Sequence, residues 1–576
     1  MTTAKETGTT IGGGPDQLAW EPPGPGMWTR DPSKQPKPPT GFFRVMVRIL
    51  NDVFGEIGPR YGLLIDGFQI ADVNGWLYLR PRPVGAPDRG GAPPPRFVMR
   101  LLLLLHPGLR ARNKAASRAL ESRLWLQDGR AWLDGGRDAF VARLREITAE
   151  DPRRLTREEL RLHIAGLVDL LREGLRIHWR DALAHFVSIG DFAQHVSAWT
   201  GVEPREVVNV LAGSSPDSIA PLEHLDRIVE VIDAAPDLRQ RFLDQELPPE
   251  DRLAALRSTS PEASATLDEY LVEYGHRGVS GFFDLDGKSI AEMPDALVAS
   301  IAARLKGPMV TLPETTDWLR PLVPDEHRDE YDALKAEAEV LYGLRDSDVG
   351  PAAQWPMGLV RRALLDGGDL LVEEGALHQR EHIFDAVPEE IDALLRTDPE
   401  APSADVLAER QLRRLTAPAD PPLILGDVQD PPSFAWLPGA LGRINNAIML
   451  GMSFDGALGA DAETRNESST AELTGIAASR GVYRGEARVV TTPEDFERLV
   501  EGDVLVAIMT TPAYNVLLPL LGAVVTDTGG VLSHAAIVAR EYHIPAVVAT
   551  GTATTTIADG SVVTVDGDQG LVTIEG

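Results

Sequence analysis

The sequence of 576 residues contains no cysteine. Disulfide frameworks, thiol catalysis and metal sites built on cysteine are therefore excluded. Long apolar runs are also scarce. The most apolar stretch, residues 97–105, is about half as long as a membrane span and contains Arg100. We interpret this stretch as a buried helix, and we expect no membrane partner.

The chain also has fewer basic residues than acidic ones. The chain carries 56 Lys and Arg against 86 Asp and Glu, which gives a formal net charge of −30. Nucleic acids and anionic membranes bind basic surfaces, so this balance argues against both as partners. The first residues also lack the apolar segment of a signal peptide. Together with the absence of cysteine, these features predict a cytoplasmic protein.

Composition divides the chain into four parts. Residues 1–40 are rich in Gly, Pro, Thr and Lys and are predicted to be a flexible arm. Residues 41–425 show mostly helical periodicity. Residues 426–472 are predicted to be a linker region because they end in a small, polar stretch. Residues 473–576 are predicted to form a compact domain.

The helical part has its clearest pattern near residue 160. Thr156 is a good N-cap, and acidic residues follow it in the first turn. Apolar residues then recur at spacings of three and four, which places them on one helix face. They are Leu160, Ile164, Leu167, Leu170, Leu171 and Leu175. Similar segments follow without a fixed period, which predicts a bundle and not a solenoid.

The last hundred residues follow a different sequence pattern. Short runs rich in β-branched residues, from GEARVV to GLVTI, are separated by Gly, Asp or Pro. A single helical pattern lies between the runs GAVVTD and PAVVAT. The predicted fold class is therefore multidomain α+β, in which a large, mostly helical domain precedes a compact, mostly-β domain.

One histidine stands at the start of that single helical pattern. Gly529 and Gly530 follow a predicted strand and let backbone amides approach a ligand closely. Ser533 is a good N-cap, so His534 falls near the first helical position, where the helix dipole favours an anion. An imidazole there can accept a phosphoryl group. The alternative is an ordinary helix-start histidine bonded to a local carbonyl.

The surrounding sequence resembles a known domain. VVTDTGGVLSHAAIVAREYHIPAVVATG, with the strands that follow it, looks like the mobile phosphohistidine domain of the phosphoenolpyruvate-utilising enzymes. VLVAIMTTPAY resembles the strand and threonine loop beside the histidine. The resemblance implies a swivelling β/β/α domain in which His534 carries the phosphoryl group. The positions that it implies for holding the phosphate are Thr510, Thr511, Gly529, Gly530 and Ser533.

The helical part is similar to the acceptor-binding domain of rifampin phosphotransferase and to the large subunit of phenylphosphate and alkylphenol phosphate synthases. LVEYGHRGVSGFFDL at 271–285 resembles their Tyr-Gly-His-Arg segment, although Ser280, Gly281 and Phe282 stand where the family usually carries a Glu. The resemblance implies that His276 is the acceptor-site base and that Arg277 stabilises the phosphoryl group. Alternatively, His276 ends a helix and Arg277 pairs with an acid.

The resemblance also implies a split enzyme. The synthase and dikinase of this family have an ATP-binding domain before the histidine domain and a phosphoenolpyruvate barrel after it. We find no phosphate-binding loop in the N-terminal part and no room for a barrel before Gly576. We therefore expect an ATP-grasp-type partner subunit to bind ATP and Mg²⁺ and to phosphorylate His534. No metal or cofactor is predicted to bind this chain directly.

The expected acceptor is the hydroxyl of a phenol or an alkylphenol. Two alternatives remain open from the sequence. The acceptor can be a larger, antibiotic-type alcohol, as in rifampin phosphotransferase. The chain can also be a non-catalytic phosphocarrier or docking protein whose helices only bind partners. The histidines His178 and His185 share one helix face, but no nearby carboxylate completes a convincing metal site.

Overall fold

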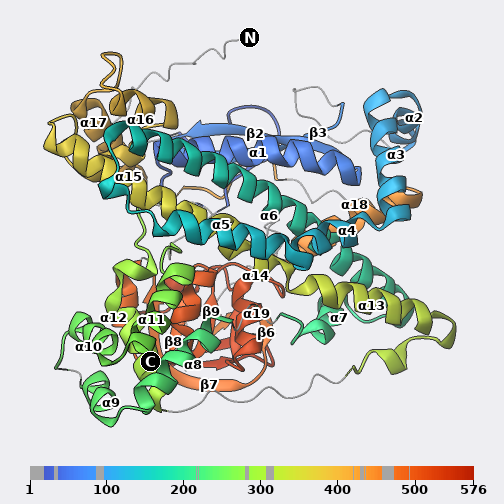
Figure 1. The fold of residues 1–576 in the computed structure, drawn as a ribbon. Helices are drawn as coiled ribbons and strands as arrows, with labels where there is room; N and C mark the ends of the chain where they lie inside the picture. Colours follow the sequence, from blue (N-terminus) through green and yellow to red (C-terminus); the bar gives the residue numbers. More distant parts are fainter. Residues whose placement is uncertain are drawn as a thin grey trace.

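The chain folds into a helical part and a sheet-containing C-terminal part, as the computed structural model shows (Figure 1). This confirms the predicted α+β class. The structure describes residues 19–31, 35, 37–85, 96–215, 217, 220–244, 246–278, 285–306, 317–418, 421–428, 434, 436–456, 472–491 and 493–575. Within the described ranges, no helix has the length and apolar character that crossing a membrane requires.

The helices before the C-terminal part are α1 (Gly41–Tyr61), α2 (Arg96–Leu105), α3 (Pro107–Ser122), α4 (Leu124–Ala131), α5 (Arg137–Ala149), α6 (Arg157–Thr200), α7 (Pro204–Val207), α8 (Ala220–Asp233), α9 (Pro236–Leu243), α10 (Pro249–Thr259), α11 (Pro261–Tyr274), α12 (Pro294–Lys306), α13 (Arg328–Tyr342), α14 (Leu344–Val349), α15 (Trp355–Glu373), α16 (Pro388–Leu395), α17 (Ala404–Leu415) and α18 (Gly439–Phe454). A π-helical turn, η8 (Gly350–Gln354), joins α14 to α15. The strands of this part are β1 (Trp28–Thr29), β2 (Ile65–Val73), β3 (Trp76–Pro83) and β4 (Ile424–Leu425).

The C-terminal part contains β5 (Glu472–Thr474), β6 (Ile476–Ser479), β7 (Val482–Val490), β8 (Asp503–Ala507), β9 (Leu521–Thr526), α19 (His534–Glu541), β10 (Ala546–Val548), α20 (Ala553–Thr556), β11 (Val562–Asp566) and β12 (Leu571–Glu575). The strands predicted from the short β-type runs are all present.

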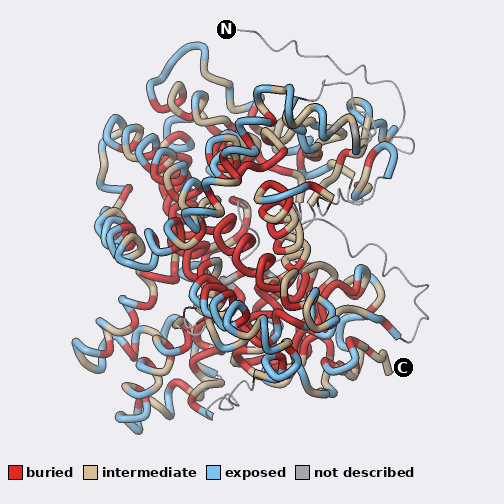
Figure 2. Tube along the Cα trace, turned by 90° about the vertical axis from the view of Figure 1, so that its right-hand side faces the viewer, coloured by how far each residue is buried: buried red, intermediate tan, exposed pale blue. Residues whose placement is uncertain are grey.

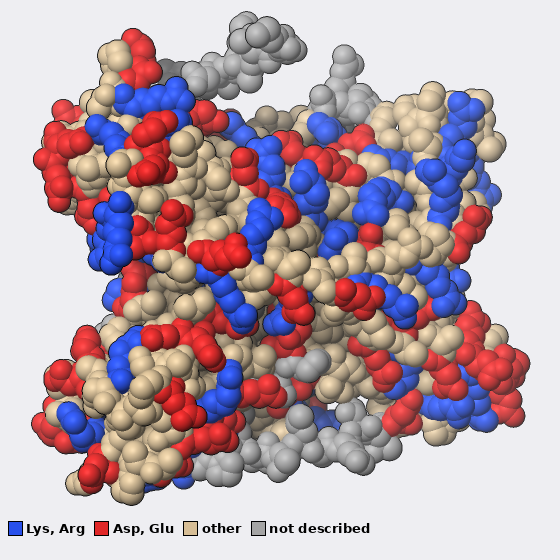
Figure 3. Space-filling view, viewed as in Figure 1, with Lys and Arg blue, Asp and Glu red and all other residues tan. Residues whose placement is uncertain are grey.

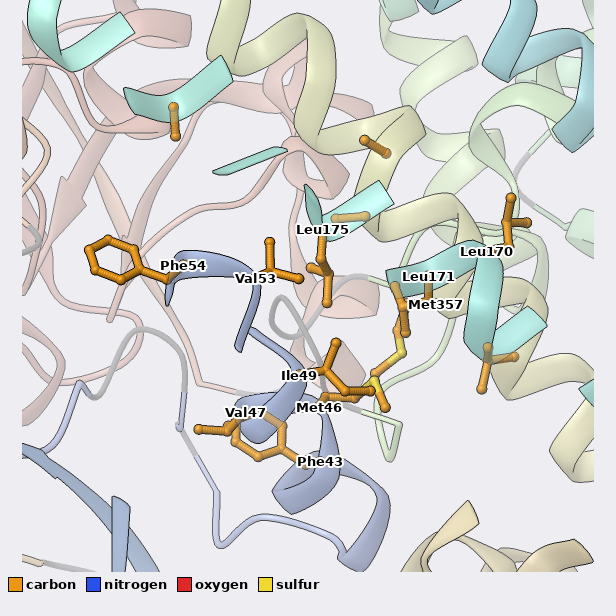
Figure 4. Packing of buried hydrophobic residues seen from close by; sticks show 14 of the residues in the cluster. Phe43, Met46, Val47, Ile49, Val53, Phe54, Leu170, Leu171, Leu175 and Met357 are labelled. Carbon is orange, nitrogen blue, oxygen red and sulfur yellow. The ribbon is translucent and has the colours of Figure 1, made fainter. Parts of the chain in front are cut away.

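The long helix α6 is the centre of the helical part. Thr156 and Glu159 form a capping box at its start, as the sequence favours, and the six apolar residues predicted to share one face are all buried. Helices α1, α15 and α18 pack along α6. Figure 4 shows side chains of α1, α6 and α15 meeting around Met46, Leu171 and Met357. Burying each such side chain stabilises the fold by roughly 1.5–3 kcal/mol.

The prediction of a flexible arm over residues 1–40 is wrong for its second half. Trp28 and Thr29 form β1, which pairs with both β3 and β4 in a sheet of order β2-β3-β1-β4. The side chain of Gln35 donates to and accepts from the backbone of Leu77, at 3.2 Å in each case. Aromatic burial and sheet pairing thus hold a segment whose composition suggested flexibility. Residues 1–18 lie outside the described residues.

The apolar stretch at 97–105 is a helix, but it is not buried as predicted. In α2, Leu101, Leu104 and Leu105 expose 53%, 70% and 64% of their surface. Leu102 and Leu103 pack against the core of the helical part. The helix lies at the edge of the molecule, so only one side of it finds a neighbour (Figure 1).

The predicted linker region, 426–472, contains a core helix. Helix α18 packs along α6 so closely that a side chain on Gly190 or Gly451 would overlap the backbone of the facing helix. The glycines at the contact allow this close approach. The polar stretch that favoured the linker lies, apart from Glu472, outside the described residues.

The C-terminal strands form one sheet in the order β5-β12-β11-β7-β8-β9-β10-β6. The four central strands, β7 to β10, are parallel neighbours, and the strands on either side of them pair antiparallel. Parallel strands run in one direction, so the loops that follow β8 and β9 leave the sheet at the same edge.

The C-terminal part is docked against the helices. Helices α8 to α12 and the sheet bury their apolar side chains in one shared hydrophobic cluster. Lys306 of α12 forms an ion pair with Glu501, at 2.7 Å. In Figure 2, buried segments continue from the upper, helical part into the lower part of the molecule. The domain that the sequence predicts to swivel is thus held here by extensive contacts.

Candidate functional site

The candidate site lies where the loops after β8 and β9 meet. Thr510 belongs to the first loop and His534 to the second, and Thr510 Oγ1 lies 2.9 Å from His534 Nδ1. The amide and hydroxyl of Thr528 both donate to the carbonyl of Ile508, at 3.0 and 2.9 Å. These bonds tie the two loops together and fix the distance between threonine and histidine.

His534 is the first residue of α19, as predicted. Ser533 is its N-cap, and the Ser533 hydroxyl accepts a hydrogen bond from the amide of Ala536, at 3.4 Å. The first amides of a helix have no partner within the helix and point toward its N-terminal end. The helix dipole adds partial positive charge there. The position therefore suits an anion bound to the histidine ring.

The helix is shorter than the three turns that Pro545 allows. It ends at Glu541 because His543 has a left-handed backbone, with φ of 53°. The helix nevertheless spans eight residues, enough for its amide dipoles to add along its axis.

Two threonines contribute hydroxyl groups next to the histidine. Thr510 and Thr511 are both buried. The Thr510 hydroxyl contacts the histidine ring, whereas the buried Thr511 hydroxyl has no hydrogen-bond partner among the described residues. A buried hydroxyl without a partner is costly, so a ligand oxygen at this place would be stabilised by it.

Gly529 and Gly530 allow a close approach of two backbones. A Cβ on Gly530 would overlap the carbonyl oxygen of Phe454, and the loop passes equally close to Gly456. The amide of Leu532 donates to the same Phe454 carbonyl, at 2.8 Å. In this arrangement the loop between β9 and α19, which we call the histidine loop, is packed on the end of α18. The role of Gly529, Gly530 and Ser533 in holding a phosphate stays a prediction.

His534 is buried, with 8% of its surface exposed. The far end of α19 is held as well. Arg540 donates to the hydroxyl of Tyr342, at 3.1 Å, and the carboxylate of Glu541 accepts from the amide of Gly213, at 3.0 Å. Burial raises the pKa of Glu541. Both ends of α19 thus contact the helical part.

Sequence reasoning missed two groups of residues at this site. The end of α18, from Phe454 to Gly456, lies in the predicted linker and gives no local signal of contact with the histidine loop. The second missed feature is Asp527. Burial raises the pKa of its carboxyl, and the carboxylate accepts a hydrogen bond from the amide of Thr554, at 3.0 Å. This contact joins the histidine loop to the start of α20.

His276 and Arg277 follow α11. The elements that they contact differ from those around His534. The backbone of His276 lies against Gly358 of α15, where a side chain would overlap it. Burial, with a smaller contribution from the cation of Arg362, lowers the pKa of His276 to about 4. The imidazole is therefore neutral near pH 7 and can accept a proton.

Arg277 is enclosed by protein. Its guanidinium lies 4.4 Å from the ring centroid of Tyr274, and its Nε donates to the carbonyl of Glu273, at 3.2 Å. The absence of a side chain at Gly350 in η8 leaves room for it. Burial lowers the pKa of Arg277. The roles of His276 and Arg277 toward an acceptor stay predictions, and Ser280, Gly281 and Phe282 lie outside the described residues.

A pocket of about 310 Å³ opens near this second site. Arg362, which lowers the pKa of His276, lines it together with Arg153 and Asp366. Its remaining lining comes from residues 148–151. The lining is mainly charged and contains no aromatic side chain, unlike the apolar surface that would receive a phenol ring.

The histidines of α6 have structural partners. His178 Nδ1 lies 3.2 Å from both carboxylate oxygens of Asp348, and His185 Nδ1 lies 3.0 Å from the carbonyl oxygen of Leu341. In the part of the chain that the structure describes, no three His, Cys, Asp or Glu side chains are grouped to hold a metal ion.

Comparison with known proteins gives two family matches. Residues 499–570 match the family described as "PEP-utilising enzyme, mobile domain", which covers β8 to β11 and includes His534. This match confirms the resemblance of the C-terminal part to the mobile domain of the phosphoenolpyruvate-utilising enzymes. Residues 182–364 match the family described as "Rifampicin phosphotransferase fourth domain". This second match runs from the middle of α6 into α15, and it contains His276 and Arg277.

The mobile domain and the helical part also have curated relatives. The uncharacterised phosphotransferase YvkC of Bacillus subtilis is 35% identical over 196 residues, which are 34% of this chain and 21% of that protein. Rifampicin phosphotransferase of the same organism is 26% identical over 336 residues, 54% of this chain and 34% of the relative. Phosphoenolpyruvate synthase of Aeropyrum pernix is 48% identical over 88 residues, 15% of this chain and 11% of that protein. The chain thus matches at most about a third of the length of these relatives.

Proposed function

We propose that the chain is the carrier and acceptor subunit of a phosphotransferase that works through a phosphohistidine at His534. The observation that carries the proposal is the position of this residue. It begins α19 behind the N-cap Ser533, and its Nδ1 is held by Thr510. The match of the surrounding segment to a mobile domain of phosphoenolpyruvate-utilising enzymes supports the same function.

In the first step, the ring takes a phosphoryl group from the donor. In the tautomer whose Nδ1–H donates to Thr510 Oγ1, the lone pair of the neutral imidazole is on Nε2, which is the nucleophile. The bond from phosphorus to the donor oxygen breaks as the bond to Nε2 forms, and the donor oxygen keeps the electron pair. The positive end of α19 offsets charge on the phosphoryl oxygens, and the buried Thr511 hydroxyl is the candidate to donate to one of them.

In the second step, an acceptor hydroxyl attacks phosphorus and the bond to Nε2 breaks. The proton of the hydroxyl passes to a base, for which neutral His276 is the candidate, while Arg277 is the candidate for stabilising the phosphoryl oxygens. His534 is covered in the docked arrangement, and His276 contacts α15. The proposal therefore includes movement of the mobile domain between a donor site and an acceptor site.

The acceptor that we favour is a phenol or an alkylphenol. A base whose conjugate acid has a pKa of about 4 is weak. Such a base removes a proton more readily from a phenol, with a pKa of about 10, than from an aliphatic alcohol. A larger, rifampicin-like alcohol is the second candidate, because residues 182–364 match a domain of rifampicin phosphotransferase.

The donor that we propose is a separate ATP-grasp-type subunit that binds ATP and Mg²⁺. Its phosphoryl group would reach His534 when the mobile domain leaves the end of α18. This partner follows from the resemblance to phenylphosphate synthase, in which the carrier and the ATP-binding unit are separate chains.

The test is the intact mass of the full chain after incubation with Mg-ATP, alone and with a candidate ATP-grasp partner. We expect an acid-labile gain of one phosphoryl group that requires the partner. His534→Ala should abolish the gain. His543→Asn, which alters another histidine of the same domain and keeps a residue that tolerates a left-handed backbone, should retain it.

The phosphorylated chain is then offered phenols and rifamycins, and loss of the phosphoryl group is followed with formation of the phosphate ester. Transfer to phenols supports the favoured acceptor, and transfer to rifamycins alone supports the second candidate. A stable phosphohistidine with no turnover on either class would favour a docking protein. No phosphorylation with any donor would contradict the proposal as a whole.

A further inference from the structure

The segment 96–120, which forms α2 and all of α3 except Glu121 and Ser122, differs in charge from the rest of the chain. It contains six Lys and Arg and no Asp or Glu, although the whole chain has a net charge of −30. We call this segment the basic hairpin. In Figure 1 it projects at the upper right corner, and the same corner of Figure 3 shows basic side chains next to uncharged ones.

Most of these cations are exposed and form no ion pair with any described residue. They are Arg96, Arg100, Arg110, Lys114 and Arg118, whereas Arg112 is buried and pairs with Asp66. Helix α17 offers a contrast. Its arginines, Arg410, Arg413 and Arg414, all pair with carboxylates. The basic hairpin therefore presents positive charge that no ion pair within the described residues neutralises.

Helix α2 of the basic hairpin also presents leucines to solvent. At 100° per residue, Arg96, Arg100 and Leu104 share the outward half of α2 with Leu101 and Leu105. All five are exposed, and the three leucines are more than half exposed. The outward half of α2 thus combines an apolar strip with arginines along one edge, which is the pattern of a helix that lies in a membrane interface.

We propose that the basic hairpin docks the protein on an anionic phospholipid surface. The leucines of α2 would enter the boundary between headgroups and acyl chains, and the arginines and Lys114 would contact the phosphates. This goes beyond the phosphotransfer function and reverses the expectation of no membrane partner. The remaining negative charge of the chain opposes docking only weakly, because charges farther than about 8 Å from the surface are screened at physiological ionic strength.

A lipid surface fits the hairpin better than an acidic protein does. Specific protein interfaces bury about 800 Å² on each partner and are centred on aromatic or arginine anchors in shaped pockets. Three exposed leucines on one convex helix offer far less apolar area. A fluid acyl layer accepts such leucines without a complementary shape.

The test is flotation of the full chain with vesicles of phosphatidylglycerol and phosphatidylcholine in equal parts. We expect binding to these vesicles, little binding to pure phosphatidylcholine, and weaker binding as salt is added. A variant with Leu101→Ser, Leu104→Ser and Leu105→Ser should bind about a hundredfold more weakly. Replacing Arg96 and Arg100 by glutamine should weaken binding by roughly fivefold per cation.

The matched control is a variant of α17, where Leu412 and Leu415 are each 63% exposed. Replacing both by serine should leave vesicle binding unchanged, because their neighbouring arginines are already paired. Phosphorylation of His534 should be the same in all of these variants. Absence of binding to the anionic vesicles, or equal loss in the α17 control, would overturn the proposal. So would light scattering that shows wild-type dimers which the α2 leucine variant no longer forms.

Discussion

Replacing Thr510 by valine is expected to slow phosphorylation of His534 and to spread it over both ring nitrogens. Valine keeps the volume of this buried side chain but removes the oxygen that lies 2.9 Å from Nδ1. A hydrogen bond of this kind contributes about 0.5–1.5 kcal/mol net. If that contribution orients the ring for attack, its loss slows the reaction by about twofold to tenfold.

The assay needs no partner subunit. Phosphoramidate, a small phosphoryl donor, is added to the folded chain, and intact mass gives the rate of the acid-labile gain. Phosphorus and proton NMR then identify which ring nitrogen carries the phosphoryl group. We expect Nε2 alone in the wild type and a mixture in Thr510→Val. Thr510→Ser restores the hydroxyl and should return both the rate and the isomer toward the wild type.

The isomer is the decisive readout, because general loosening of the domain would change the rate without favouring Nδ1. Thermal unfolding of the variants serves as the control for folding. If Thr510→Val reacts at the wild-type rate and only at Nε2, then the threonine does not orient the ring. The assignment of Nε2 as the nucleophile would then lose its basis.

Three further predictions concern docking, buried charge and pH. Gly530→Ala would press a methyl group against the backbone of α18, so hydrogen exchange of the histidine loop should become faster. Its control is Gly166→Ala on α6, where the added methyl group meets open space. That variant should leave the fold unchanged or stabilise it by about 1 kcal/mol. Arg414→Met would leave the buried Asp385 carboxylate without its cation, and chemical denaturation should show a loss of about 3–5 kcal/mol in the free energy of unfolding. Arg413 forms an exposed ion pair with Glu409, so Arg413→Met should change the free energy of unfolding by no more than about 0.5 kcal/mol. The lowered pKa of His276, about 4, means that the unfolded chain binds more protons between pH 4 and 6.5. Stability should therefore fall by about 2 kcal/mol from pH 7 to pH 5, and denaturation of His276→Gln should show a smaller fall.

Several features of the fold could be predicted from the sequence because they depend on neighbours close in the chain. The capping residue Thr156 and the apolar period after it specify α6. Ser533 specifies the start of α19 and thereby places His534 at its first turn. The β-type runs of the C-terminal part are each separated by turn residues, so every predicted strand is present.

Burial was less predictable, because it depends on residues far away in the sequence. The run at 97–105 is apolar except for Arg100, yet half of α2 finds no neighbour at the edge of the molecule. Conversely, the small, polar stretch at the end of residues 426–472 predicts a linker, although this region contains α18. α18 is a core helix because Gly190 of α6 lets the two backbones approach.

The candidate site divides in the same way. Local sequence features identify the residue that can carry a phosphoryl group, since an N-cap, a histidine and a helix start depend on neighbours in the chain. Long-range packing, in contrast, places Thr510 against one ring nitrogen, brings the end of α18 onto the histidine loop, and buries His276 enough to keep it neutral. Each of these depends on the distance between elements that the chain connects through many residues, and packing sets that distance.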